Sequence, residues 1–245
     1  MPRYFIEVAY LGTNYSGFQI QDNANSIQAE VEKALHIYYR EKFILTGSSR
    51  TDAGVHALSN YFHFDSPYPI ALKSVYNINA LLPNDIVVQR IFAVHNDAHC
   101  RFDATFREYK YYISRYKNPF LINTAWHYPY NLNIEILNQT AATIKEHNNF
   151  ESFSKKNTQV NNFFCRIDVS KWYYDEQTKC LVYHVIGNRF LRGMVKGLVS
   201  TMILVSRNKI TLKQFEEILQ SKDSSKANFS APSKGLFLCS VGIDS

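Results

Sequence analysis

The segment at residues 47–58 places a single carboxylate, Asp52, between a cationic residue and small residues, and this combination could support chemistry. Apolar alternating residues on both sides predict two strands, so the segment should form a turn that projects from their ends. Gly54 would give the turn backbone freedom, and Arg50 could hold a phosphate or orient the acid. The alternative is an ordinary strand connection with a solvated aspartate, because Asp and Gly are common turn residues.

The residues around Asp52 form a longer motif, which bears on the choice between a chemical role and an ordinary turn. Residues 50–57 read RTDAGVHA, and this run resembles the signature of the tRNA pseudouridine synthase A family. A weaker region of similarity holds Phe150, Phe153 and Arg166. Further blocks that resemble the family's pattern occur in order along the chain, at residues 9–19, 79–86, 101–111, 187–196 and 231–238. The resemblance therefore spans nearly all of the 245 residues.

The resemblance implies an isomerase that converts uridine to pseudouridine in transfer RNA. This reaction breaks the bond between ribose C1′ and uracil N1, turns the base and joins C1′ to C5. Charge that develops at C1′ is oxocarbenium-like, so a carboxylate can stabilise it or attack it. The resemblance makes Asp52 the essential carboxylate, and two routes stay open: attack on C1′, or action as a base toward a glycal. No redox change occurs and no group leaves the nucleotide, so neither an organic cofactor nor a metal ion is expected.

Two further catalytic residues follow from the resemblance. Tyr109 lies in an alternating strand, and the family motif places it against the target base, where stacking and help with C5 proton removal are both possible. A tyrosine that only packs in its strand is the alternative. Lys196 is implied to pair with Asp52 and hold it ionised, at a place where the family usually has arginine with its planar fork. The residues implied to contact the substrate or the RNA are Arg50, Tyr109, Arg189, Arg192, Gly235, Leu236 and Leu238.

Three basic residues near position 190 also have a helical spacing. Arg189, Arg192 and Lys196 recur at i, i+3 and i+7, which predicts a cationic face on a helix that begins near Phe190. A solvated helix face is the ordinary interpretation of such a stripe. Three other residues differ from the family's usual ones and bear on RNA contacts more than on catalysis: Ser49 in place of Gly, Asn60 in place of Gln, and Asn149 in place of Asp.

Periodicity along the chain predicts an α+β fold. Asn25 or Ser26 should cap an early helix, and a capping box at Thr211 should open a late one. Strands are predicted at 4–10, 42–46, 59–64, 85–92, 106–115, 163–174 and 180–186, and helices between Pro69 and Pro83, at 132–146 and from about Phe190. The resemblance implies two similar α/β lobes: residues 1–105 carry the Asp52 loop, and residues 106–245 complete the active-site cleft. Their antiparallel sheets would form one continuous central sheet, with helices on one side and an RNA-binding cleft on the other.

Composition is that of an ordinary globular protein with a basic balance. The hydrophobic fraction of 46% suits a substantial core, and a net charge of +6 with a pI near 9.0 favours a polyanionic partner. Seventeen tyrosines and seventeen phenylalanines predict a core built largely from rings. Four scattered cysteines predict neither a disulfide framework nor a zinc site, and the pair His95 and His99 lacks a third ligand. No signal peptide or membrane span of about 20 residues is evident, so a soluble cytoplasmic protein is expected.

The resemblance implies a homodimer that modifies the anticodon stem-loop of tRNA, at positions 38–40. Two functions of other classes stay open from the residues alone. A tRNA-binding module that lacks catalysis is suggested by Lys196 and Asn60, and retention of the whole run at residues 50–57 argues against it. A hydrolase that uses Asp52 and His56 is disfavoured, because a second carboxylate and metal ligands are missing from the pattern.

Overall fold

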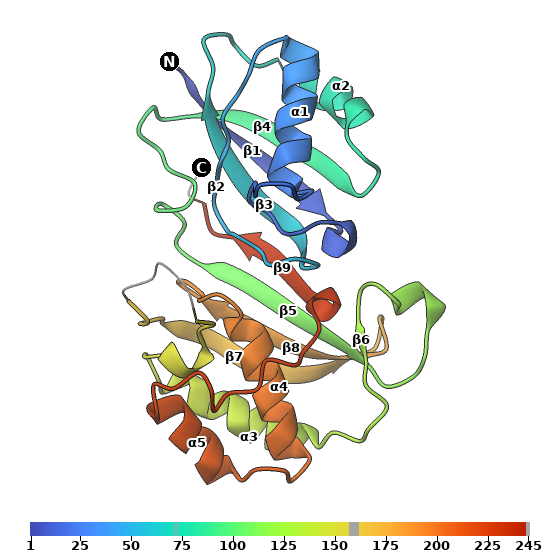
Figure 1. Ribbon diagram of the computed structural model, residues 1–245, viewed down its shortest axis with the longest axis vertical. Coiled ribbons are helices and arrows are strands. Elements are labelled where there is room, and N and C mark those ends of the chain that lie inside the picture. The colour runs from blue at the N-terminus through green and yellow to red at the C-terminus, as the bar shows by residue number, and fades with distance from the viewer. Residues whose placement is uncertain (72, 157–161, 244–245) are drawn as a thin grey trace. The chain divides into compact units, whose positions relative to one another are not determined.

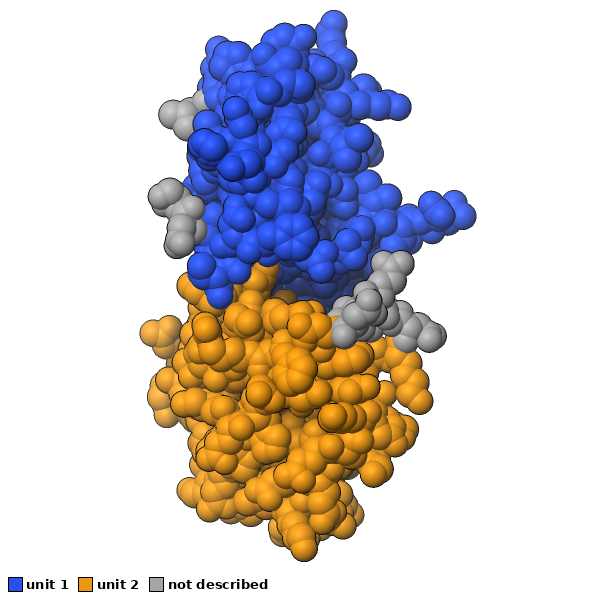
Figure 2. Space-filling model, turned by 90° about the vertical axis from the view of Figure 1, so that its left-hand side faces the viewer, with its two compact units in different colours: residues 1–105, 237–245 blue, residues 106–236 orange. Residues whose placement is uncertain are grey.

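The chain divides into two compact units, each described here by itself (Figure 2). The computed structural model describes residues 1–71, 73–156 and 162–243. Unit 1 comprises Met1–Thr105 together with Phe237–Ser245, and unit 2 comprises Phe106–Leu236. Unit 1 is therefore built from both ends of the sequence.

Unit 1 is organised around strands in the order β4-β1-β3-β9 (Figure 1). β1 runs antiparallel to β3 and to β4, β2 adds antiparallel to β3, and β9 runs parallel to β3. Six of the eight residues of β1 are buried, as expected for a strand between two others. The bounds are β1 (Arg3–Tyr10), β2 (Thr46–Gly47), β3 (His56–Asp65), β4 (Ile86–Val94) and β9 (Leu236–Val241).

Two helices, α1 (Ile27–Tyr39) and α2 (Ser74–Leu81), lie over one face of these strands (Figure 1). The Ala29 N–H donates to Ser26 Oγ at 3.3 Å, which confirms Ser26 as the cap of α1. The apolar residues at helical spacing are buried, namely Ile27, Val31, Ala34 and Leu35. The spacing that predicts the helix is thus also the spacing that packs it.

Aromatic rings fill the core of unit 1 next to the Asp52 turn. Phe18 stacks on Phe62 with ring centroids 4.2 Å apart and an interplanar angle of 9°, and it stacks on Tyr10 with centroids 5.8 Å apart. Gly47 has no room for a side chain, since a Cβ there would lie 2.4 Å from Phe18 Cε1. The predicted use of rings as core is confirmed here, and it gives the turn a closely packed support.

Unit 2 has strands in the order β5-β8-β7, all antiparallel, with β6 added parallel to β5. The bounds are β5 (Arg107–Ser114), β6 (Trp126–His127), β7 (Ile167–Asp175) and β8 (Cys180–Gly187). Helix α3 (Ile134–Lys145) packs on β7, and α4 (Met194–Ser206) and α5 (Leu212–Gln220) pack beside it (Figure 1). Short 3₁₀ turns are η1 (Gly12–Asn14), η2 (Pro119–Leu121), η3 (Glu151–Phe153) and η4 (Ser233–Gly235).

Helix α4 is the buried helix of unit 2, since twelve of its thirteen residues are buried. Helix α5 is amphipathic, and it buries Phe215 and Leu219. The predicted capping box is confirmed: the Gln214 N–H donates to Thr211 Oγ1 at 3.1 Å, and the Thr211 N–H donates to Gln214 Oε1 at 2.8 Å. Reciprocal bonds of this kind satisfy two backbone donors at a helix start.

The predicted α+β class is confirmed, with nine strands and five α-helices among the described residues. The strand predicted at 42–46 is wrong, because only Thr46–Gly47 pairs as β2. Side chains of α1 hold the preceding residue instead: the Leu45 N–H donates to Glu32 Oε1 at 3.0 Å, and Gln28 Nε2 donates to Leu45 O at 2.8 Å. Its backbone groups are therefore satisfied without a sheet.

Candidate active site

The Asp52 turn is fastened by backbone hydrogen bonds to the segment that follows β1. The Phe18 N–H donates to Thr51 O at 3.1 Å, and the Gly54 N–H donates to Tyr15 O at 3.3 Å. One bond precedes Asp52 and the other follows it. The backbone of the turn is thus held on both sides of the carboxylate.

His56 closes the turn as a packed residue. It is fully buried, its Nδ1 accepts a hydrogen bond from the Gly12 N–H at 3.0 Å, and its ring centroid lies 4.5 Å from that of Phe237. An Nδ1 that accepts from a backbone N–H carries no proton of its own. Gly12 is required at this contact, because a Cβ would lie 2.0 Å from Val55 O. His56 is thus a packing residue of unit 1.

Asn60 on β3 is fully buried and bonds to the turn. Its Nδ2 donates to Ser49 O at 2.8 Å and to the Tyr10 hydroxyl at 3.1 Å, and its Oδ1 accepts from the Ser49 N–H at 3.3 Å. The Tyr10 hydroxyl lies 2.8 Å from Thr51 Oγ1. Both Asn60 and Ser49 are buried, so these two departures from the family's usual residues lie beneath the surface of the turn.

Asp52 itself is half-buried at the tip of the turn, and Arg50 beside it is exposed. The Val55 N–H donates to Asp52 O at 3.1 Å and closes a tight turn. Gly54 has φ of 76°, a left-handed backbone that glycine adopts without steric cost. A side chain at a fixed, partly open turn can reach a substrate without unfolding its surroundings.

The C-terminal residues of the predicted site are packed into the fold. Gly235 lies against a ring of β5, since a Cβ there would be 2.8 Å from Tyr111 Cζ. The absence of a side chain at Gly235 therefore lets the backbone approach a tyrosine closely. Leu236 and Leu238 are buried, and Leu238 pairs with Ala57 of β3 at the end of the Asp52 segment.

Tyr109 lies on β5, half-buried and opposite Val185 of β8. Its ring meets Phe190 edge-on, with centroids 5.0 Å apart and an interplanar angle of 78°. Sequence reasoning placed Phe190 at a helix start and missed this contact. The signal that could have revealed the contact is that Phe190 is an aromatic residue inside the block at residues 187–196, which resembles the family's pattern.

The predicted cationic helix face is wrong. Gly193, with φ of 75°, precedes α4, so Arg189 and Arg192 lie in the loop before the helix. Arg189 is half-buried and Arg192 is exposed. Lys196 is in the first turn of α4 but only 6% exposed, and its Nζ donates to Ser233 Oγ at 3.0 Å. The lysine is therefore buried and does not belong to a solvated stripe.

Comparison with known sequences identifies the family. A model of the family described as tRNA pseudouridine synthase matches residues 6–103 and 147–244. The chain belongs to the tRNA pseudouridine synthase family. Residues 104–146, which include Tyr109, lie outside that match, whereas the Asp52 turn and Lys196 lie within it.

Relatives named tRNA pseudouridine synthase A match this synthase over nearly their whole length. The protein of Bacteroides thetaiotaomicron is 42% identical over 98% of this chain and 90% of its own. That of Porphyromonas gingivalis is 40% identical over 97% and 96%, and that of Staphylococcus aureus is 33% identical over 99% and 91%. The chain is thus an isomerase of this family with tRNA as its substrate.

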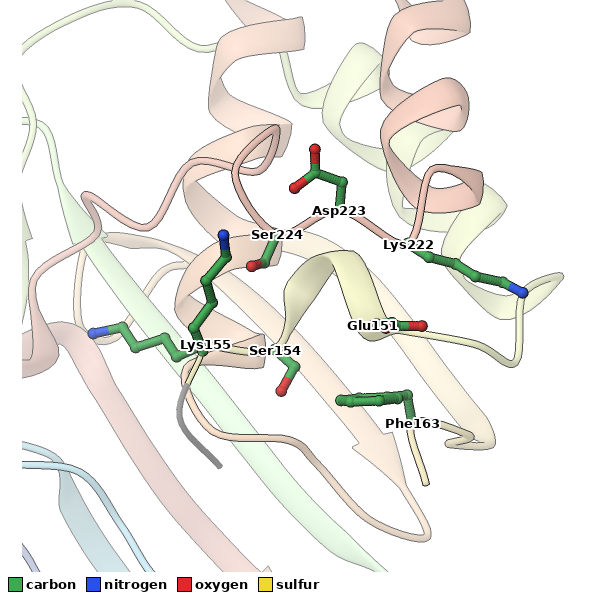
Figure 3. A pocket seen from close by; sticks show the side chains of 8 residues that line it. Glu151, Ser154, Lys155, Phe163, Lys222, Asp223 and Ser224 are labelled. Carbon is green, nitrogen blue, oxygen red and sulfur yellow. The ribbon is translucent and has the colours of Figure 1, made fainter. Parts of the chain in front are cut away.

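A shallow hollow of about 410 Å³ lies elsewhere in unit 2 of this synthase (Figure 3). It is lined by Glu151, Ser154, Lys155, Lys156, Phe163, Lys222, Asp223 and Ser224. Its three lysines are offset by two carboxylates, so its charge does not single out an anion. None of the predicted site residues lines it.

The described residues of the synthase contain no group of three or more His, Cys, Asp or Glu that could hold a metal ion. His95 is bonded to Asp97, and the His99 ring packs on Phe102 with centroids 4.2 Å apart. Within the same residues, no helix combines the length and the apolar character needed to cross a bilayer.

Proposed function

We propose that this synthase isomerises uridines in the anticodon stem-loop of tRNA, with Asp52 as the essential carboxylate. The observation that carries the proposal is the Asp52 turn: an RTDAGVHA segment whose backbone is bonded on both sides of a half-buried Asp52. Catalysis gains most from groups whose geometry is set before the substrate arrives. A fixed acid beside an exposed Arg50 suits a nucleotide that must leave its helix to be reached, at a cost of a few kcal/mol.

The carboxylate has two possible roles, and the proposal covers both. Asp52 can attack C1′ as the bond to N1 breaks, or it can remove a ribose proton on the way to a glycal. On the first route C5 displaces Asp52 from C1′, and on the second the ribose proton returns to the sugar as C5 bonds to C1′. Loss of the C5 proton and protonation of N1 complete either route. The uracil stays with the enzyme throughout, so the overall reaction is an isomerisation.

The other site residues are assigned by the same proposal. Tyr109 lies against the target base, with Phe190 holding its ring edge-on. Lys196 is the cationic partner of Asp52, and its burial supports this role, because a buried ammonium is costly unless an anion offsets it. The residues proposed to contact RNA or the base are Arg50, Arg189, Arg192, Gly235, Leu236 and Leu238.

The proposal includes assembly and location. We infer a homodimer in which one tRNA lies across two subunits, and an enzyme that works in the cytoplasm where tRNA is processed. Sedimentation of the full chain at micromolar concentration should give twice the mass of 28.4 kDa. A monomer that turns over tRNA would overturn the dimer.

Release of tritium from tRNA labelled at uridine C5 tests the chemistry. We expect Asp52→Asn to lower release about 1,000-fold or more, as removal of an essential nucleophile or base does, while tRNA binding persists. Lys196→Met should also lose release, and Lys196→Arg should keep part of it, because arginine retains the charge. When the anticodon-arm uridines of the tRNA are replaced by cytidine, the wild-type enzyme should no longer release tritium.

The outcomes separate the competing functions. A binding module would hold tRNA without releasing tritium, and a hydrolase would free uracil or cut the strand. Full release by folded Asp52→Asn would overturn the assigned carboxylate. Undiminished release from RNA that lacks anticodon-arm uridines would overturn the assigned stem-loop.

A further inference from the structure

We propose that Asn60 and Tyr10 form a buried positioning network that fixes the direction of the Asp52 carboxylate. The inference rests on the proposed role of Asp52, and all of its residues belong to unit 1. Asn60 and Tyr10 are positioning residues, since each acts through the backbone or side chain of the turn and neither needs to touch the substrate.

The Asn60 side chain acts on Ser49 as a neighbouring strand would. Its amide donates to the Ser49 carbonyl at 2.8 Å and accepts from the Ser49 N–H at 3.3 Å, so both backbone groups of one residue are engaged. The two bonds also determine which amide atom is nitrogen, because a carbonyl can only accept and an N–H can only donate. These two bonds hold the backbone at Ser49, two residues before Thr51.

Tyr10 extends the network to Thr51, the residue directly before Asp52. Asn60 Nδ2 donates to the Tyr10 hydroxyl at 3.1 Å, and a hydrogen bond of 2.8 Å joins that hydroxyl to Thr51 Oγ1. Burial raises the pKa of the Tyr10 hydroxyl, so the hydroxyl keeps its proton near neutral pH. The network therefore runs without a break from Asn60 through Tyr10 to Thr51.

The remaining bonds of the turn complete the restraint. The Thr51 carbonyl accepts from the Phe18 N–H at 3.1 Å, and the Asp52 carbonyl accepts from the Val55 N–H at 3.1 Å. With residues on both sides held, the backbone from which the Asp52 carboxylate projects is restrained. A rigid backbone limits the arc over which the side-chain torsions can carry the acid.

The turn keeps this shape at a cost. The hydroxyls of Ser48 and Ser49 are buried and have no hydrogen-bond partner among the described residues. A buried hydroxyl without a partner is unfavourable, so a segment free to move would turn these groups toward water. The Asn60 bonds oppose that movement, which is the behaviour expected of a restraint built into a functional turn.

Unit 1 contains a matched control for the same geometry. Asn79 Nδ2 donates to Val88 O at 2.8 Å, and the Val88 N–H donates to Asn79 Oδ1 at 2.7 Å. This second asparagine clamp joins α2 to β4, and among the described residues it makes no hydrogen bond to the turn at residues 48–55. Removing it should cost stability of the same kind without moving Asp52.

The test compares Asn60→Ala, Tyr10→Phe and Asn79→Ala in the full chain. For each variant we would measure single-turnover tritium release at saturating enzyme, tRNA dissociation by filter binding, and the urea midpoint. We expect Asn60→Ala and Tyr10→Phe to slow the turnover rate about 10- to 100-fold, since a shift of about 1 Å at a reacting group can cost that much. Their tRNA affinity should stay near that of wild type. Asn79→Ala should keep the wild-type rate with a lowered urea midpoint.

Each other result has a meaning. Wild-type rates in folded Asn60→Ala and Tyr10→Phe would overturn the positioning network, as would equal rate losses in all three variants. Tyr10→Phe removes one oxygen only, so it remains informative if Asn60→Ala fails to fold. Full activity of Asp52→Asn would instead overturn the proposed function, and that failure is seen in a separate variant.

Discussion

At the scale of single residues, burial sets what each polar side chain can do. In the turn, Asp52 is half-buried and Arg50 is exposed, whereas Asn60, on the strand that follows the turn, is fully buried. Sequence reasoning found Asp52 from its motif. It could not find the Asn60 network, because hydrogen bonds between residues 10, 49, 51 and 60 exist only once β1 and β3 pair. Polar residues in a strand pattern look alike until the register is known.

His63 gives a prediction about pH at the same scale. Burial, then the nearby His99 and Arg3, lower the pKa of His63 to about 4, although Asp65 and Asp103 act in the opposite direction. An unfolded histidine titrates near pH 6.5. Between these pKa values the His63 imidazole is protonated in the unfolded chain but not in the folded chain. The contribution of His63 to the free energy of unfolding is therefore intact above pH 6.5 and is lost as the pH falls toward 4.

We therefore expect the urea midpoint of the wild type to fall on acidification from pH 7 to pH 4.5. His63→Gln should fall less over the same interval, because its side chain does not titrate. Exposed His127, on β6, serves as the control, and His127→Gln should follow the wild-type curve. Parallel curves for His63→Gln and wild type would contradict the lowered pKa.

At the scale of elements, local signals predicted what local forces decide. Caps at Ser26 and Thr211 and helical spacing located α1 and α5, since each depends on neighbours within one or two turns. The strand at 42–46 failed because side chains of α1 satisfy Leu45 from a distance in sequence. The predicted start of α4 near Phe190 is wrong because Gly193, with its left-handed backbone, comes directly before the helix. The helical spacing of the residues continues across Gly193 even though the helix does not.

Packing between η1 and the Asp52 turn gives the prediction for this scale. In Gly12→Ala the new Cβ would meet Val55 O at 2.0 Å, so the backbone of one segment must move. We expect a loss of about 1–3 kcal/mol in the free energy of unfolding, as overpacking costs elsewhere. Exposed Thr13 in the same turn is the control, and Thr13→Ala should change it by less than about 0.5 kcal/mol. Urea unfolding measures both, and equal midpoints for the two variants would refute the close contact.

At the scale of the whole molecule, unit 1 combines the N-terminal part of the chain with β9 from its C-terminal part. β9 pairs with β3 at His56 and Ala57, so residues near the C-terminus support the end of the Asp52 segment. Contacts between residues so far apart in sequence carry no local signal, and only the resemblance pointed to residues 235–238 as part of the site. The α+β class was predictable from strand and helix periods, whereas the parallel β9 pairing was not.

The net charge of +6 leads to a prediction about tRNA binding as a whole. Each phosphate that the protein neutralises releases counterions, so the logarithm of the association constant should fall linearly with the logarithm of salt concentration, by about 0.7–0.9 per contact. Arg50 is exposed beside the proposed carboxylate, so Arg50→Gln should reduce the slope by about one contact.

Lys179 supplies a control of equal charge. Its Nζ is paired with Glu176 Oε2 at 2.9 Å in the β7–β8 hairpin, and Lys179→Gln should leave the slope unchanged, because a cation already paired with a carboxylate releases few counterions from RNA. Filter binding between about 50 and 300 mM KCl would measure the slopes of the wild type, Arg50→Gln and Lys179→Gln. Salt weakens protein–RNA complexes strongly over this range. If Arg50→Gln and Lys179→Gln reduce the slope equally, the effect belongs to net charge, and a phosphate contact at Arg50 is refuted. If only Arg50→Gln reduces it, the electrostatic contact lies at the residue next but one to Asp52, where an everted nucleotide must arrive.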